Sequence, residues 1–278
     1  MDTAIGNIIT AAEKANPPRD GDYIGEDGLL YCGKCHTVKQ KRVTLHGWPE
    51  NYPFPASCKC EAAKEAEKRR RQQLETIVLD LRETAFDEPE MLRWTFQNDM
   101  GYQPTLTEGM KRYVDLLLSK PLEECPGLLL TGDVGRGKSF AAAQVVNALI
   151  EKGIRCRMTS FGRIEDDLKD RQVNVKEYRE RLNHCKLLVL DDLGTERSTS
   201  YMDEFVYKII DARYRSRLPL ILTTNLPLEE IKKPKSTADS RVFSRILQMC
   251  HPVNVEGHDI RRSIAAGRYT DMRDLLGI

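Results

Sequence analysis

The chain has 278 residues, of which 40% are hydrophobic and 31% are charged, and its formal net charge at pH 7 is +1. This balance excludes an intrinsically disordered chain, and the small net charge excludes nucleic-acid binding through an overall basic surface, so any such contact must be local. No apolar run is long enough to cross a bilayer, and the first residues lack the basic segment of a secretory signal. We therefore expect a cytoplasmic protein without membrane contact.

Four of the eight cysteines lie in a region rich in Gly, Pro and aromatic residues, at Cys32, Cys35, Cys58 and Cys60. In a chain without a secretory signal, clustered cysteines suggest a metal before disulfides. A Cys-x-x-Cys turn presents two thiolates to one tetrahedral ion, and the Cys-x-Cys pair would close the site, which predicts structural zinc. A redox pair or free thiols are the alternative. The remaining cysteines lie singly beside apolar strands and are predicted to fill the core.

Helices are predicted on both sides of this region. Residues 1–15 have the pattern of a short amphipathic helix, which either packs on the cysteine module or docks on a partner protein. Residues 61–83 are predicted to form one long helix that is charged at first and apolar later, a natural connector. The basic cluster at residues 68–71 is interpreted either as a solvated helical face or as a contact with nucleic acid.

A phosphate-binding loop is the most specific motif. Residues 128–130 predict a buried strand, residues 140–152 predict a helix, and the segment between them has the pattern G-x-x-x-x-G-K-S. In this pattern backbone N–H groups point at phosphate oxygens, Lys138 reaches the β- and γ-phosphates, and Ser139 offers a hydroxyl to magnesium. The predicted nucleotide-binding residues are Gly132, Asp133, Val134, Gly135, Arg136, Gly137, Lys138, Ser139 and Phe140.

Strands and helices alternate around this loop, which predicts an α/β fold with a doubly wound parallel sheet flanked by helices. A helix at 107–119 leads into the strand that precedes the loop. The later predicted strands are 155–159, 186–192, 218–224 and 251–255, and the later predicted helices are 161–171, 175–184, 201–215 and 240–250. A last turn is expected from Arg261.

Two of these predicted strands end in polar side chains. Asp191 is predicted to hold the magnesium ion, and Asp192 to orient or deprotonate the attacking water. Residues 223–225 form a polar tip where the γ-phosphate and water would lie, and the same residues also fit a helix cap.

Taken in order, these motifs resemble an AAA+ ATPase of the initiator and loader clade. More narrowly, they are similar to the DnaC/DnaI-type replicative helicase loaders, especially the zinc-bearing versions of Gram-positive bacteria and their phages. The likeness covers nearly the whole chain, including the cysteine module and the linker helix. The resemblance implies a zinc-binding, partner-docking module over residues 1–60, a linker over 61–105 and an AAA+ domain over 106–278.

The resemblance also implies residue roles. ATP would lie between neighbouring subunits, so the ATPase domain should self-associate. Arg245 matches the arginine finger that completes a neighbour's site, with Arg241 as the alternative. Asn225 matches sensor one and Arg261 matches sensor two, which touches the nucleotide from the same subunit. Cations around the γ-phosphate suit phosphoryl transfer.

Single-stranded DNA is implied along the inner face of an assembled spiral. The candidate contacts are Arg197, Thr199 and Tyr201, which together offer a cation, a hydroxyl and an aromatic ring for stacking. Packing of Tyr201 within its helix is the alternative.

The implied function is an ATP-dependent loader that delivers the hexameric replicative helicase onto single-stranded DNA at replication initiation, with ATP, magnesium and zinc as cofactors. An IstB-like transposition helper is an alternative, although that family is not expected to carry the cysteine module. A zinc-containing DNA-binding regulator with a structural nucleotide site is another. Whether the zinc module docks the helicase or restrains the ATPase stays open.

Two departures from the family pattern carry expectations. The family's usual Asp-Glu is here Asp191-Asp192, and the shorter second acid predicts slow ATP turnover, as in a switch. The short segment after Arg261 leaves little of a helical lid, so we expect a lone subunit to hold nucleotide more loosely than an assembly does.

Overall fold

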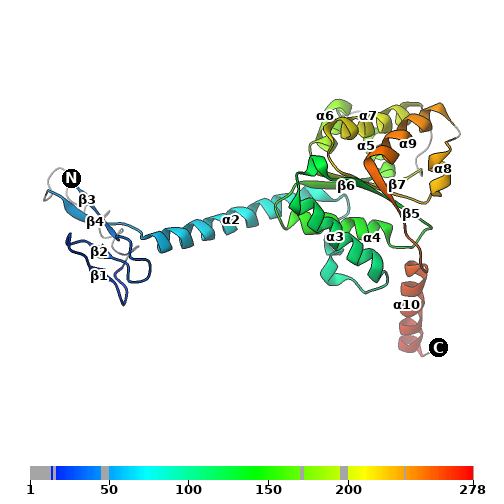
Figure 1. Cartoon of the computed structure of the whole chain (residues 1–278). Helices are drawn as coiled ribbons and strands as arrows, with labels where there is room; N and C mark the ends of the chain where they lie inside the picture. The colour runs from blue at the N-terminus through cyan, green and yellow to red at the C-terminus, as the bar shows by residue number, and fades with distance from the viewer. Residues whose placement is uncertain are drawn as a thin grey trace. The chain divides into compact units, whose positions relative to one another are not determined.

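A computed structural model describes residue 14 and residues 17–44, 50–169, 172–194, 200–234 and 236–277. The chain divides into two units, Met1–Glu75 and Thr76–Ile278, and each is described by itself (Figure 1). Apart from residue 14, the helix expected at 1–15 lies outside the described residues. None of the helices in the described ranges is both long and apolar enough to span a membrane.

The first unit holds two small antiparallel sheets. One pairs β1 (Tyr23–Ile24) with β2 (Leu30–Tyr31), and the other pairs β3 (Gln40–Val43) with β4 (Tyr52–Pro55). Among its described residues, the hydrophobic side chains that are buried are those of Cys32 and Cys58. The described residues therefore supply little apolar core, and we expect another source of stability in this unit.

Helix α2 (Lys59–Ala85) carries the predicted linker and extends it at both ends. The basic residues 68–71 are exposed. Two of them form ion pairs one turn away within the helix, Arg69 with Glu65 at 3.3 Å and Arg71 with Glu75 at 3.0 Å. Pairs at this spacing favour the interpretation of the cluster as a solvated helical face.

The second unit is built on a five-stranded parallel sheet in the order β6-β7-β8-β5-β9. Its strands are β5 (Gly127–Thr131), β6 (Cys156–Ser160), β7 (Leu187–Leu193), β8 (Leu220–Thr224) and β9 (Cys250–Asn254). The predicted α/β class with a parallel sheet is confirmed. Since every pair is parallel, the carboxyl ends of the strands meet at one edge, where Thr131 lies opposite Thr224.

Helices cover both faces of this sheet (Figure 1). One face packs against α3 (Pro104–Ser119), α4 (Lys138–Ile150) and the end of α2, and the other against α5 (Phe161–Lys169), α6 (Val175–Asn183), α7 (Ser200–Ser216) and α9 (Thr237–Met249). A short helix, α8 (Leu228–Lys232), and the 3₁₀ turns Pro89–Arg93, Phe96–Asn98 and Leu122–Glu124 complete the connections. The four single cysteines are buried in the two cores, as predicted: Cys125, Cys156, Cys185 and Cys250.

One element differs from the expectation. The last turn predicted at Arg261 is helix α10 (Ile260–Leu276), which has 17 residues. The carboxylate of Asp259 caps it by accepting the N–H of Arg262 at 3.2 Å. Large apolar side chains such as Tyr269 and Leu275 are exposed along it. Every residue of α10 whose burial the structure describes is at least partly exposed, so this helix buries little apolar surface within the unit.

Candidate nucleotide site and cysteine cluster

The phosphate loop joins the buried strand β5 to the first turn of α4. Gly137 caps α4 with φ of 86°, a conformation that favours glycine. Gly132 has φ of 137°, and a Cβ on it would overlap the carbonyl oxygen of Val255. The glycines therefore let the loop turn tightly against β9 and start α4 with its N-terminal N–H groups turned toward the loop.

Lys138 is 6% exposed, and its ammonium group is held by three oxygens. Its Nζ donates to the carbonyls of Gly132 at 2.6 Å and Asp133 at 2.8 Å, and to Oδ1 of Asn225 at 2.8 Å. Burial lowers the pKa of Lys138, while the nearby carboxylates of Asp192 and Asp191 act in the opposite direction. The structure thus brings two predicted site residues, Lys138 and Asn225, into direct contact.

Asp191 and Asp192 lie inside β7, where the pairing with β8 shifts register between Leu190 and Leu193. Asp192 has φ of 58°, a left-handed conformation that is uncommon for a residue other than glycine and interrupts the regular strand at this point. One buried hydroxyl connects both residues: Thr223 Oγ1 donates to Asp191 Oδ1 at 2.5 Å and accepts the N–H of Asp192 at 2.9 Å.

Asp191 is 8% exposed, and burial raises its pKa. Hydrogen bonds from Thr223 and Ser139 act against that rise and favour the carboxylate. The two residues predicted to hold magnesium, Ser139 and Asp191, are therefore neighbours, and a hydroxyl beside a buried carboxylate is a donor set that suits this ion.

A cavity of about 390 Å³ lies over the loop. Its lining includes most of the predicted nucleotide-binding residues, namely Val134, Gly135, Arg136, Gly137, Lys138, Ser139, Phe140 and Arg261, together with Asp192 and Asn225. Gly132 and Asp133 instead face Lys138 with their carbonyls. A volume of this size fits a small molecule such as a nucleotide.

The sequence did not point to a second part of this lining. It comes from the segment before α3 and from the start of α10, and includes Trp94, Asp99, Tyr102, Gln103, Ile260 and Ile264. Gln103 ties these two parts together because its Nε2 donates to the carbonyl of Glu256 at 2.8 Å. In the sequence, the segment before α3 is interrupted by Pro and Gly and has no periodic pattern, so its residue types did not indicate a role.

The two candidate finger arginines lie on α9 in different environments. Arg245 pairs through Nε with Asp211 Oδ1 at 3.0 Å, donates from Nη2 to the Tyr207 hydroxyl at 3.0 Å, and lies 4.8 Å from the centre of that ring. Arg245 also donates from Nη1 to the carbonyl of Arg241 at 3.1 Å. The Arg241 side chain is exposed. The contacts within the subunit therefore engage Arg245 and leave Arg241 at the surface.

Of the three candidate DNA contacts, the structure describes one. Tyr201 lies in the first turn of α7 and is 53% exposed. Arg197 and Thr199 lie outside the described residues. The Tyr201 side chain is therefore only partly packed against the rest of the unit.

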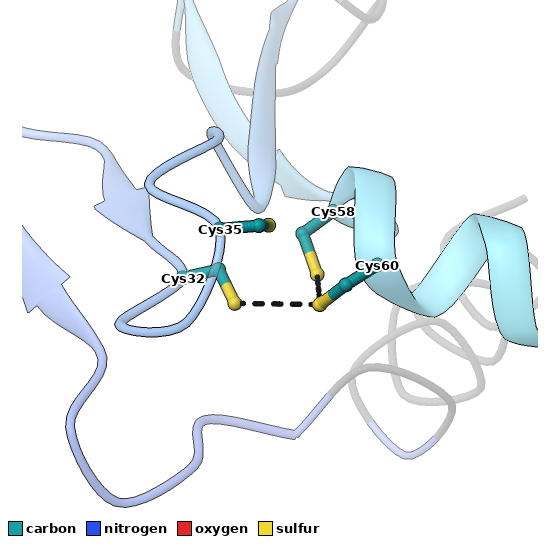
Figure 2. Close-up of side chains that lie close together, drawn as sticks. All are labelled: Cys32, Cys35, Cys58 and Cys60. Atoms are coloured by element: carbon teal, nitrogen blue, oxygen red, sulfur yellow. Dashed lines mark hydrogen bonds between the residues drawn. The ribbon is translucent and has the colours of Figure 1, made fainter.

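The four clustered cysteines come together in the first unit (Figure 2). All four Sγ atoms lie within 4.8 Å of one another, with Cys32 3.7 Å from Cys60 and Cys58 3.2 Å from Cys60. Zinc–sulfur bonds of about 2.3 Å in a tetrahedron place sulfur atoms about 3.8 Å apart. The donor set and its spacing therefore fit a tetrahedral zinc ion that is closed by protein ligands.

The thiols of this cluster differ in their surroundings. Burial raises the pKa of Cys58 to about 12. A hydrogen bond with the hydroxyl of Thr37, at 3.0 Å, lowers the pKa of Cys35 to about 5. The same hydroxyl accepts the N–H of Lys59 at 3.0 Å, so Thr37 joins the two halves of the cluster.

The sequence profile of the family described as IstB-like ATP binding protein matches residues 92–266. This range covers more than half of the chain and contains the phosphate loop, the acidic pair and α9. The chain belongs to this family. The resemblance to DnaC/DnaI-type proteins is confirmed at the level of the AAA+ family and fold.

The individual relatives include replicative helicase loaders and an ATP-binding protein of an insertion sequence. The replicative helicase loader DnaI of Bacillus subtilis is 25% identical over 216 residues, which cover 73% of this chain and 67% of DnaI. An ATP-binding protein of an insertion sequence from Mycobacterium tuberculosis is 26% identical over 219 residues, which cover 76% of this chain and 83% of that protein. The loader DnaC of Escherichia coli is 28% identical over 109 residues, or 38% of this chain and 44% of DnaC.

Solved structures share the fold of the second unit. A crystal structure of DnaI superposes with a TM-score of 0.54 at 22% identity and covers 64% of this chain and 96% of that one. A crystal structure of the DnaC helicase loader superposes with a TM-score of 0.52 at 23% identity and covers 61% and 100%.

Proposed function

We propose that this chain is an ATP-dependent loader that delivers a hexameric replicative helicase onto single-stranded DNA. The observation that carries the proposal is the presence, on one chain, of a P-loop nucleotide cavity and a separate unit with four clustered thiols. The similarity to DnaI over 73% of the chain supports it. ATP-bound subunits would assemble and hold the DNA, and hydrolysis would help release the partner.

In this proposal the cavity is an ATPase site. Lys138 and the loop N–H groups bind the phosphates, Ser139 and Asp191 hold magnesium, and Asp192 orients the water. Asn225 contacts the γ-phosphate region. Magnesium would neutralise phosphate charge and hold the phosphate oxygens in place.

The site would be completed between subunits. An arginine of α9 would reach the phosphates of the neighbouring subunit, and Arg261 would act within its own subunit. The contacts described above favour Arg241 as the finger, since Arg245 would have to leave Asp211 to reach a neighbour. Arg245 would then support Arg241 through the Arg241 carbonyl.

The first unit would bind zinc through its four thiolates and dock the helicase, in the cytoplasm. A zinc ion held by four protein ligands keeps no open position, so it would stabilise the unit and take no part in hydrolysis. Tyr201, with Arg197 and Thr199, would contact single-stranded DNA by stacking and phosphate contacts.

A second candidate is a transposition helper with a transposase as partner. The family profile and the insertion-sequence relative support it, since that relative matches 76% of this chain. Transposition helpers are not expected to carry the cysteine module, and its presence on this chain favours the loader. A DNA-binding regulator with a structural nucleotide site is a third reading, which loss of ATP hydrolysis in a folded Lys138→Ala variant would exclude.

Native mass spectrometry with the replicative helicase of the same host, in ATP or a slowly hydrolysed analogue, tests the proposal. We expect a discrete complex that is lost when Cys58 and Cys60 are both replaced by Ser. Lys59→Ala is the matched control, because Lys59 is exposed and lies between the two cysteines. Absence of a complex in every nucleotide condition would refute the loader, and a transposase from the same genome would be tested next.

A further inference from the structure

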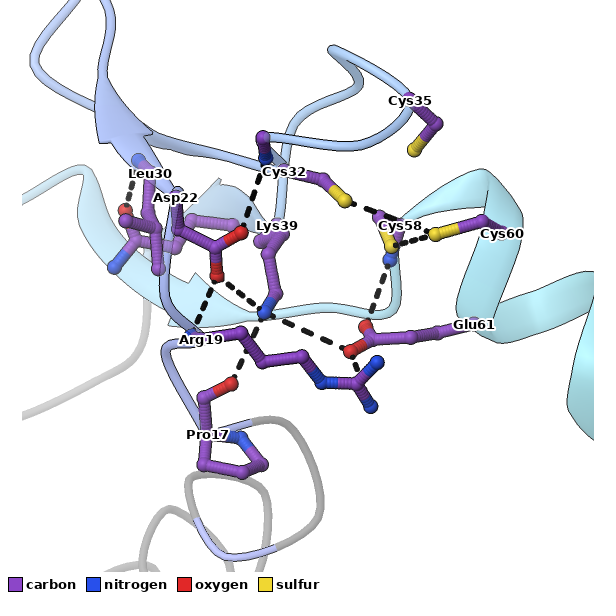
Figure 3. A network of polar contacts seen from close by, with 12 residues as sticks. Pro17, Arg19, Asp22, Leu30, Cys32, Cys35, Lys39, Cys58, Cys60 and Glu61 are labelled. Carbon is purple, nitrogen blue, oxygen red and sulfur yellow. Dashed lines mark hydrogen bonds and ion pairs between the residues drawn. The ribbon is translucent and has the colours of Figure 1, made fainter.

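Lys39 is buried beside the cysteine cluster (Figure 3). Its side chain is 1% exposed. The ammonium group donates to the carbonyl of Pro17 at 3.0 Å and to Asp22 Oδ2 at 2.7 Å, and lies 3.6 Å from Glu61 Oε1. An ammonium group has three donors, and here each of them has an oxygen to face. A buried charge is tolerated when it is paired in this way.

The two carboxylates that pair with Lys39 each reach one half of the cluster. Asp22 Oδ1 accepts the backbone N–H of Gly33, inside the Cys-x-x-Cys turn, at 3.1 Å. Glu61 Oε2 accepts the backbone N–H of Cys58 at 3.4 Å. Both halves of the cluster are therefore connected to the same ammonium group through one carboxylate each.

The backbone of Lys39 connects the two small sheets. Its N–H donates to the carbonyl of Leu30, in β2, at 2.7 Å, and its carbonyl accepts the N–H of Ala56, just after β4, at 2.8 Å. Since the described part of this unit buries few apolar side chains, Lys39 occupies the place that a large hydrophobic residue fills in an ordinary core.

Arg19 also belongs to the network but is placed differently. Its guanidinium lies 2.9 Å from Glu61 Oε1, and its side chain is 55% exposed. The side chain of Asp22, by contrast, is 4% exposed. Loss of the Lys39 charge would therefore leave the nearly buried carboxylate of Asp22 without its cation and with little access to water.

We propose that Lys39 is a positioning residue for the zinc site. Its ammonium group holds the turn at Gly33 and the backbone at Cys58 in the arrangement that lets four thiolates share one ion. Its charge also opposes the net negative charge that four thiolates and one Zn²⁺ carry together. The inference rests on the proposed zinc site. Residues that orient metal ligands in this way govern metal affinity without touching the metal.

The test is the affinity of the full chain for Zn²⁺, measured by competition with a chromophoric chelator, together with the rate of zinc release. Lys39→Met removes the charge and keeps an unbranched side chain. Lys41→Met is the matched control because it removes the same charge from an exposed position in β3. We expect Lys39→Met to weaken zinc affinity about 10- to 100-fold, and Lys41→Met to change it less than about twofold.

Equal zinc affinity and release rate in wild type and Lys39→Met would overturn the inference while leaving the zinc site standing. A wild-type chain that binds no zinc would overturn both. Nucleotide binding by the second unit should be the same in all variants and reports that this unit is folded. If Lys39→Met does not fold, Asp22→Asn and Glu61→Gln take its place, and unchanged zinc affinity in both would overturn the inference.

Discussion

The ammonium group of Lys138 lies 2.8 Å from Oδ1 of Asn225, which is 87 positions later in the chain. The contact is possible because β5 and β8 are neighbours in register, with Thr131 opposite Thr224. A phosphate that draws Lys138 away from the loop carbonyls would change its contact with Asn225. The pair therefore connects ligand binding in the loop to the polar tip of β8.

Asn225→Ala should separate nucleotide binding from hydrolysis. Lys138 keeps its two carbonyl partners, so we expect ATP affinity to change less than about fivefold, whereas loss of a polar group aimed at the developing charge should slow hydrolysis about 100-fold. Equilibrium binding and steady-state hydrolysis measure the two quantities. Asn254→Ala, at the end of strand β9, which pairs with β5, is the control and should leave both unchanged. A hydrolysis rate equal to that of the wild type would refute the role of Asn225.

Thr223→Val should impair the acidic pair. The substitution keeps the shape of a fully buried side chain but removes the hydroxyl that joins Asp191 to the N–H of Asp192. We expect a stability loss of about 1–3 kcal/mol, because both groups lose a partner away from water. The catalytic rate should fall about tenfold with little change in KM, since the position of Asp192 is altered and not the phosphate loop.

Thr223→Ser supplies the control for this prediction, because serine retains the hydroxyl. Its catalytic rate should stay close to that of the wild type. If Thr223→Val and Thr223→Ser lose the same activity, the effect comes from packing, and the bridging role of the hydroxyl is wrong.

The order of the strands and of most helices could be predicted, because each buried strand is a short apolar run and the helices between the strands show the helical repeat of apolar residues. The phosphate loop and the neighbouring acids follow from residue type and spacing alone. The positive φ of Asp192 could not be predicted, because it arises from a register shift between β7 and β8. Similarly, the cluster of four cysteines could be predicted from the sequence, whereas the burial of Lys39 beside it could not.

Arg213 illustrates the limit of charge patterns. A basic residue in the last turn of a helix is expected to be exposed. In the structure Arg213 is fully buried, and it donates to the carbonyl of Cys185 at 2.9 Å and to its sulfur at 2.7 Å. The contact joins α7 to the residue two positions before β7, across 28 positions of the chain, and the charge pattern does not report such a contact.

Substitution of the two arginines on α9 should have different effects on stability and on hydrolysis. Arg245→Ala removes an ion pair with Asp211 and the contact with the Tyr207 ring, so it should lower the free energy of unfolding by about 1–2 kcal/mol. Arg241→Ala removes an exposed side chain and should leave stability unchanged. Hydrolysis should nevertheless fall in Arg241→Ala if this residue completes a neighbour's site.

A mixing experiment distinguishes action between subunits from action within one. Arg241→Ala subunits retain Lys138, and Lys138→Ala subunits retain Arg241, so a mixture can form intact sites at some interfaces. We expect the mixture to hydrolyse ATP faster than either variant alone. No gain on mixing, together with full activity of Arg241→Ala alone, would assign the finger elsewhere.

Removal of zinc should loosen the first unit and spare the second. The described part of the first unit buries Cys32 and Cys58 as its hydrophobic side chains, whereas the sheet of the second unit lies between two large apolar cores. In such a module the free energy of metal binding stabilises the folded state. Chelation should therefore expose its backbone to solvent. Hydrogen exchange of the full chain, with and without chelator, should show faster exchange at 30–31 and 40–43 and unchanged exchange at 127–131. Equal protection of the first unit in both conditions would mean that its fold does not depend on the metal, and equal loosening of both units would mean that they unfold together.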